Sequence, residues 1–110
     1  MKLEINGFEN MKYTNQKFSK WKIFDATETS EKYELCARDR DTPASACAVA
    51  IRIYKMPYTE VAPNVYKVKL YYDEFTNRIW EGYVRYSDIK NKSGFFQMML
   101  EEITKYENNK

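Results

Sequence analysis

Few residue types in this sequence could perform catalysis. The chain of 110 residues contains no histidine, which removes both the commonest general base and the commonest metal ligand. A nucleophile would have to be Cys36 or Cys47, without an imidazole partner to activate it. Asp39 and Asp41 lie two positions apart, but in a polar loop among arginines such carboxylates are usually solvated and paired. We therefore expect a protein that is not an enzyme.

Metal and cofactor sites are not predicted either. Structural zinc sites need close pairs of Cys or His, and here two cysteines stand well apart without any imidazole. Calcium loops need several acidic residues at alternate positions followed by a glycine, a pattern that Asp39 and Asp41 do not complete. With only three glycines, the chain has no glycine-rich phosphate loop. We expect neither a metal nor a cofactor.

One segment has the composition of a nucleic-acid groove. Between residues 12 and 22, basic and aromatic side chains alternate without any acidic residue: Lys12, Tyr13, Lys17, Phe18, Lys20, Trp21 and Lys22. Cations that neutralise phosphates, next to rings that stack on bases, suit a single strand. The same residues also suit an edge strand, because aromatic rings anchor cores and lysines protect exposed sheet edges. Both interpretations stay open, and a second basic patch is expected from Tyr83, Arg85, Lys90 and Lys92.

A second candidate surface is predicted for a protein partner. The segment 94–100 is apolar on more sides than one sheet face can bury, which leaves Phe95 and Met98 on an exposed flank of a helix. Tyr83 and Arg85 are expected on the strand face opposite the core, and aromatic and Arg side chains often dominate binding energy. The alternative is a helix enclosed on both sides within one monomer. Self-association would cover the same apolar excess.

Hydrophobic periodicity predicts the elements that position these residues. Apolar side chains at every second position indicate two hairpins, over residues 32–54 and 64–86, and shorter strands over 1–6 and 19–25. A helical spacing of apolar residues follows Ser93, the expected N-cap, after a polar connection over 87–92. Residues 8–18 show no clear period. The predicted fold is α+β: an antiparallel sheet of about five strands with a C-terminal helix packed across one face.

The core and the cysteines follow from this alternation. One core is expected beneath the helix, formed by Val49, Ile51, Val68, Leu70, Trp80, Val84, Met99 and Ile103. Residues opposed in an antiparallel pair share a face, so Cys36 and Cys47 fall on opposite faces of their hairpin and are expected to be free thiols. Gly82, on the same face as Trp80, is expected to leave a gap that a neighbouring ring or a packed helix can occupy. The chain length predicts a single domain over residues 1–110.

The composition points towards recognition. Ten Tyr, six Phe and two Trp favour half-buried sheets and contact surfaces, while a net charge of +2 indicates local patches. No stretch is long and apolar enough to span a bilayer, and a cytoplasmic location is expected.

The leading hypothesis is a non-catalytic protein that docks on a macromolecular partner, most often a protein, and modulates or inhibits it. The expected class is that of small accessory and inhibitor proteins of phages and mobile elements, such as anti-CRISPR proteins. The alternative is a single-stranded nucleic-acid-binding module. An antiparallel sheet of four strands followed by a helix resembles, in topology alone, the PC4-like and Whirly-type single-strand binders.

Overall fold

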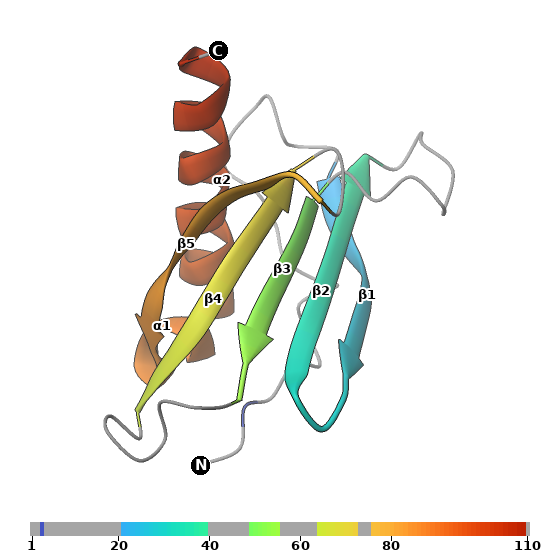
Figure 1. Cartoon of the computed structure of the whole chain (residues 1–110), viewed down its shortest axis with the longest axis vertical. Helices are drawn as coiled ribbons and strands as arrows, with labels where there is room; N and C mark the ends of the chain where they lie inside the picture. Colours follow the sequence, from blue (N-terminus) through green and yellow to red (C-terminus); the bar gives the residue numbers. More distant parts are fainter. Residues whose placement is uncertain (1–2, 4–20, 40–48, 56–63, 73–75, 110) are drawn as a thin grey trace.

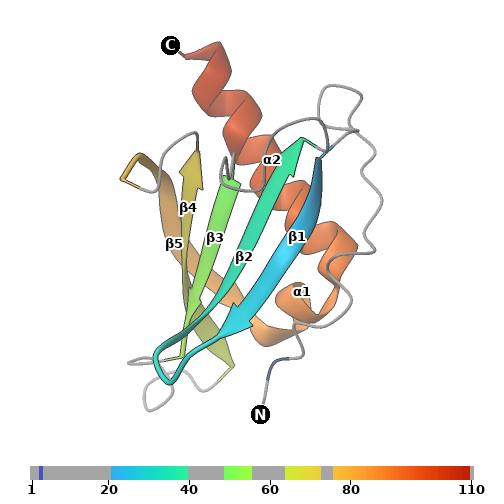
Figure 2. The ribbon, with the colours of Figure 1, turned by 90° about the vertical axis from the view of Figure 1, so that its right-hand side faces the viewer.

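The chain folds into one antiparallel sheet with a long helix behind it. The computed structural model describes Leu3 and residues 21–39, 49–55, 64–72 and 76–109. Five strands follow one another in the sheet in chain order: β1 (Trp21–Glu28), β2 (Lys32–Asp39), β3 (Val49–Tyr54), β4 (Val65–Tyr72) and β5 (Arg78–Arg85). Two helices complete the fold, α1 (Tyr86–Lys90) and α2 (Lys92–Asn108). The sheet stands in front of α2 in Figure 1, and Figure 2 shows α2 crossing one face at an angle.

The sheet confirms the predicted alternation. Leu35 lies opposite Ile51, which lies opposite Leu70, so one row of apolar residues crosses three strands. Because side chains alternate along a strand, every second residue of each strand turns to the same side. These residues form a cluster with α2, in which Leu35, Ile51 and Leu70 are fully enclosed. The predicted α+β fold, with a C-terminal helix on one sheet face, is therefore confirmed.

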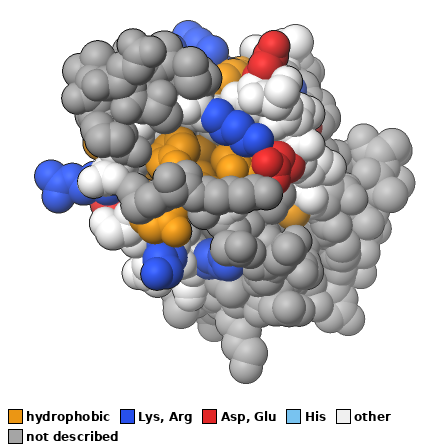
Figure 3. Space-filling view, turned by 90° about the horizontal axis from the view of Figure 1, so that it is seen from below, with side chains coloured by type: hydrophobic (Ala, Val, Ile, Leu, Met, Phe, Trp, Pro, Cys, Tyr) orange, Lys and Arg blue, Asp and Glu red, His pale blue; other side chains and the backbone are white. Residues whose placement is uncertain are grey.

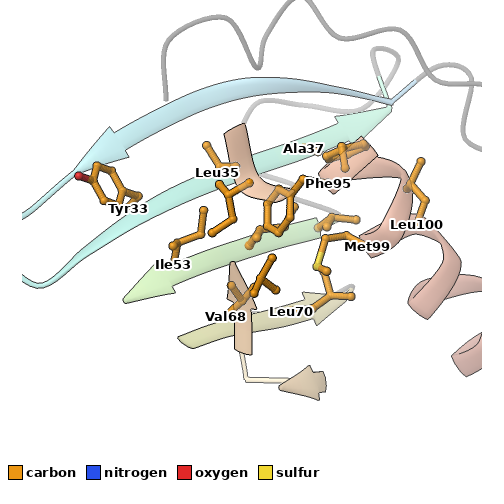
Figure 4. Close-up of a cluster of buried hydrophobic side chains, with 14 of the residues drawn as sticks. Tyr33, Leu35, Ala37, Ile53, Val68, Leu70, Phe95, Met99 and Leu100 are labelled. Atoms are coloured by element: carbon orange, nitrogen blue, oxygen red, sulfur yellow. The ribbon is translucent and has the colours of Figure 1, made fainter. Parts of the chain in front are cut away.

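Phe95 and Met99 point from α2 into this cluster (Figure 4). The helix buries residues at helical spacing, namely Phe95, Phe96, Met99, Leu100 and Ile103. At its other end, the Tyr72 hydroxyl donates a hydrogen bond of 2.9 Å to Glu107, and the Tyr72 and Tyr106 rings meet edge to face. α2 is thus attached to the sheet along most of its length.

The expectation that Phe95 lies on an exposed flank is wrong. Only 1% of Phe95 is exposed, and Met98 is half-buried against the same core. The physical reason lies in the segment that the sequence predicted as a polar connection, which is the short helix α1. Its Ile89 is also 1% exposed and belongs to the same cluster. α1 therefore helps to enclose the start of α2, and the apolar excess is buried within one chain.

Trp80 occupies a space that Gly82 leaves open. Trp80 is half-buried against the core, and a Cβ atom at Gly82 would lie 2.5 Å from its ring. Of the two expected occupants of this gap, a ring or a packed helix, the structure shows a ring. The other predicted core residues, Val49, Ile51, Val68, Leu70, Val84, Met99 and Ile103, are all buried.

Some expectations concern residues outside the described part of the chain. Of the strand expected over 1–6, only Leu3 is described; it is buried at 3% exposed but does not lie in a strand. Cys36 forms no disulfide and lies on the predicted face, opposite Ala50, whereas Cys47 is not among the described residues. α2 begins at Lys92 with Asn91 as its N-cap, two residues before Ser93, the expected N-cap.

Replacing Phe95 by Ala is expected to destabilise the protein by about 3–5 kcal/mol, because it empties a fully buried ring site in a domain of marginal stability. Met98→Ala serves as the matched control on the same helix and is expected to cost about half as much, since Met98 is half-buried. Urea unfolding measures both. Equal costs for the two variants would contradict the burial of Phe95.

Gly82→Ala is expected to cost about 1–3 kcal/mol, because the new methyl group collides with the Trp80 ring. In a Trp80→Leu background the same change is expected to be neutral or slightly stabilising, since alanine suits a strand better than glycine. A double-mutant cycle by urea unfolding checks this coupling. The same cost in both backgrounds would show that the collision does not limit stability.

Candidate nucleic-acid interface

The sheet face turned away from α2 carries the polar half of each strand. We call the following side chains the outer face: Lys32, Glu34, Cys36, Ala50, Arg52, Tyr54, Lys67, Lys69, Tyr71, Arg78, Glu81, Tyr83 and Arg85. The pairing places them out of phase with the core residues. Ala50 and Tyr71 support this assignment, because both are buried and yet do not belong to the cluster beneath α2.

The outer face concentrates positive charge. Among its described side chains, six are basic and only two, Glu34 and Glu81, are acidic. The whole chain has a net charge of +2. The outer face therefore carries a net charge of +4, and all remaining residues together are net negative.

Glu81 is shared by three of these cations. Its carboxylate lies 3.3 Å from the Lys67 ammonium, 3.8 Å from Lys69 and 3.8 Å from Arg78. A hydrogen bond from Lys67 is the main cause that lowers the pKa of the Glu81 carboxyl, and the charges of Lys67, Arg78 and Lys69 act in the same direction. Glu81 therefore stays ionised at neutral pH, but one carboxylate cannot neutralise three cations.

The second acidic side chain is paired one to one. Glu34 accepts a hydrogen bond from Arg52, which lies directly opposite it on the neighbouring strand. Arg52 also stands over the Tyr71 ring, with its guanidinium carbon 4.7 Å from the ring centre. This contact places one arginine against an aromatic ring in the middle of the sheet.

Tyrosines alternate with the cations across the strands. In one row Lys32 faces Tyr54, Tyr54 faces Lys67 and Lys67 faces Tyr83. The Lys69 ammonium lies 5.1 Å from the Tyr54 ring centre. At the β5 edge, Tyr83 is 53% exposed and is the large apolar side chain most open to solvent among the described residues. The face thus presents rings and cations side by side.

The structure brings together only part of the predicted sites. Tyr83 and Arg85 lie exposed on the outer face as expected, whereas Phe95 is in the core and Met98 is half-buried. Trp21 and Lys22 belong to β1, where they pair with Asp39 and Arg38, and the structure does not describe their side chains. The other members of the predicted basic segment lie outside the described residues: Lys12, Tyr13, Lys17, Phe18 and Lys20.

Sequence reasoning missed most of the outer face. Arg52, Tyr54, Lys67, Lys69 and Tyr71 were not among the predicted site residues. The signal that could have found them is the alternation itself, because every residue out of phase with the core must point to the opposite side. That these basic and aromatic residues form one cluster becomes evident only when the four strands are aligned in register.

Within the described ranges, no group of three or more Cys, Asp or Glu is arranged to hold a metal ion. Neither α1 nor α2, the helices of the described chain, combines the length and apolar character needed to cross a membrane.

The side chains of the outer face determine whether it can bind a nucleic-acid strand or a protein partner. The outer face offers cations, aromatic rings and hydrogen-bond donors, with its two carboxylates already engaged by arginine and lysine. Comparison with known proteins finds no family model, no curated protein and no solved structure that matches this chain.

Proposed function

We propose that the outer face binds single-stranded nucleic acid and that the protein acts by binding, without catalysing a reaction. The observation that carries the proposal is the combination of six basic side chains with Tyr54 and the exposed Tyr83 on one sheet face. Lys and Arg neutralise phosphates, and tyrosine rings stack on bases irrespective of sequence. A nucleic-acid strand whose bases are accessible can use both kinds of contact at once.

A single strand fits this face better than a duplex. In a double helix the bases are stacked on one another, so an exposed ring such as Tyr83 would find no base plane to contact. Duplex binding usually inserts a helix or ribbon into a groove, whereas this face is a sheet surface with its rings set among the cations. The exposed Tyr83 at the β5 edge favours an unpaired base.

The distribution of charge also favours a flexible anionic chain. Three cations share the single carboxylate of Glu81, so their charge is only partly balanced within the protein. A phosphate that approaches Lys67, Lys69 or Arg78 competes with that carboxylate. Binding therefore exchanges a partial internal ion pair for a phosphate contact and releases the counterions of the strand.

A titration with a labelled oligonucleotide at several salt concentrations tests the proposal. If three or four phosphates are neutralised, the slope of log K against log salt is expected to be about −2 to −3, from about −0.7 per phosphate on single strands. Fluorescence anisotropy with single-stranded and duplex forms of the same sequence makes the measurement. No binding at low salt, or preference for the duplex, would overturn the proposal.

Tyr83→Ala is expected to weaken binding of the oligonucleotide by about 1–3 kcal/mol, because it removes a ring on which a base can stack. Tyr83→Phe is the matched control and should bind almost as the original protein does, since the ring is retained. The exposure of Tyr83 means that neither change should alter the melting temperature appreciably. Equal loss in both variants would assign the effect to the hydroxyl rather than to stacking.

Glu81→Gln is expected to tighten binding about two- to fivefold, because the change releases three cations from their shared carboxylate. Glu101→Gln removes the same charge from an exposed position on α2 and should leave the affinity within about twofold. Anisotropy at low salt compares the two. If both variants tighten binding equally, only net charge matters and the outer face is not the binding surface.

Docking on a protein partner is the second candidate function. The observation that favours it is Tyr83 beside Arg85 on an exposed strand, since Tyr and Arg are the side chains enriched at protein contact surfaces. The oligonucleotide titration separates the two functions. A protein-docking surface gives no salt-dependent affinity for single strands.

A further inference from the structure

Two hollows meet at Tyr86, where β5 passes into α1. One has a volume of about 220 Å³ and is lined by Asn64, Arg85, Tyr86 and Ser87. The other has a volume of about 230 Å³ and is lined by Leu3, Tyr86, Lys90 and Lys92. Figure 3 shows this underside of the molecule, with apolar side chains in its recessed middle and Lys and Arg side chains around them.

The wall between the hollows is held in place by the fold. Tyr86 is half-buried and packs against the core, and its backbone N–H donates a hydrogen bond of 2.6 Å to the Asn64 carbonyl. Ser87 is tied in the same way, because its carbonyl accepts a hydrogen bond from the Asn91 N–H. A side chain fixed by packing presents its surface to a ligand without a further loss of entropy.

The lining chemistry is that of a nucleotide site. In the first hollow, the half-buried Tyr86 offers apolar surface to a flat ring, while the amide of Asn64 and the hydroxyl of Ser87 offer donors and acceptors for its edge. Arg85, Lys90 and Lys92 supply positive charge, and Asp88 is the acidic residue nearby on α1, exposed to solvent. No carboxylate is among the described residues that line either hollow.

Arg85 connects this site to the outer face. It lies on the same side of β5 as Tyr83, two residues along the strand, and it also lines the first hollow. A nucleic-acid strand that crosses the outer face and leaves it at the C-terminal end of β5 therefore arrives beside Tyr86. Lys90 and Lys92 then lie ahead of it, on the rim of the second hollow.

We propose that the underside holds one unstacked nucleotide of the bound strand. Its base lies against Tyr86, the base edge is recognised by Asn64 and Ser87, and the flanking phosphates are held by Arg85, Lys90 and Lys92. This site rests on the proposed function and adds to it, because a pocket with an amide and a hydroxyl distinguishes bases, whereas the open outer face does not. The protein therefore prefers particular bases at one position of the strand.

Photo-crosslinking tests the location of the site. Oligonucleotides of about ten nucleotides with iodouridine at successive positions are irradiated with the intact protein, and the product is digested with trypsin. Arg85 separates the two tyrosines of interest, so Tyr83 is recovered in peptide 79–85 and Tyr86 in peptide 86–90. One position of the strand is expected to crosslink to peptide 86–90. Crosslinks that never include this peptide, while peptide 79–85 is labelled, would overturn the inference and leave the outer face intact.

Base preference provides the second measurement. We expect at least a threefold difference in affinity among homopolymers, and the double variant Asn64→Ala, Ser87→Ala should abolish it while retaining binding to every homopolymer. Both residues are exposed, so folding is preserved, and Asn108→Ala at the far end of α2 is the control. Equal affinity for all homopolymers, or a preference that survives the double variant, would overturn the site alone.

Two further measurements show whether the site or the proposed function has failed, and whether the ligand is a bound strand or a free nucleotide. If no oligonucleotide binds at all, the proposed function itself falls. A nucleoside monophosphate should compete only weakly with the strand, because it lacks the outer-face contacts. If it instead binds tightly and is lost in the double variant, the underside is a free-nucleotide site and the assignment to a bound strand is overturned.

Discussion

A single long helix can bury only one face of a sheet, and the rest of this structure depends on that constraint. Each central strand must place an apolar residue under α2 at every second position, so the intervening positions are directed to the other side. The register Leu35–Ile51–Leu70 keeps these two sets apart across three strands. A slip by one residue would exchange the apolar face for the charged one, so burial of the core also determines which residues are offered for binding.

Burial beneath α2 explains why the functional surface is not where apolar composition alone would place it. The Phe and Met residues at the start of α2 are used to close the core, together with Ile89 from α1. What remains for recognition is polar and aromatic. Tyrosine suits that position, because its ring packs against neighbouring lysine and arginine side chains while its hydroxyl stays near water.

The ion pairs of the outer face affect ligand binding more than they affect the stability of the fold. Exposed ion pairs contribute little to folding, so the three contacts of Glu81 matter mainly for how they set the charge offered to a ligand. The contact between Arg52 and Tyr71 has a different consequence, since it restricts a side chain in the middle of the sheet. The exposed Tyr83 and Arg85 extend the outer face along β5 as far as the hollows at Tyr86.

The sequence by itself determined the fold class, because alternation and helical spacing are local patterns that burial imposes directly on the chain. It was sufficient for the two hairpins, for the core residues from Val49 to Ile103, and for a gap at Gly82, although not for its occupant. The tertiary structure decided that Phe95 is buried. The neighbouring helix α1 covers this turn of α2, and its polar sequence had not indicated that it would do so. It also decided the outer face: Lys67, Tyr54 and Tyr83 become neighbours only through strand register, which brings together residues that are far apart along the chain.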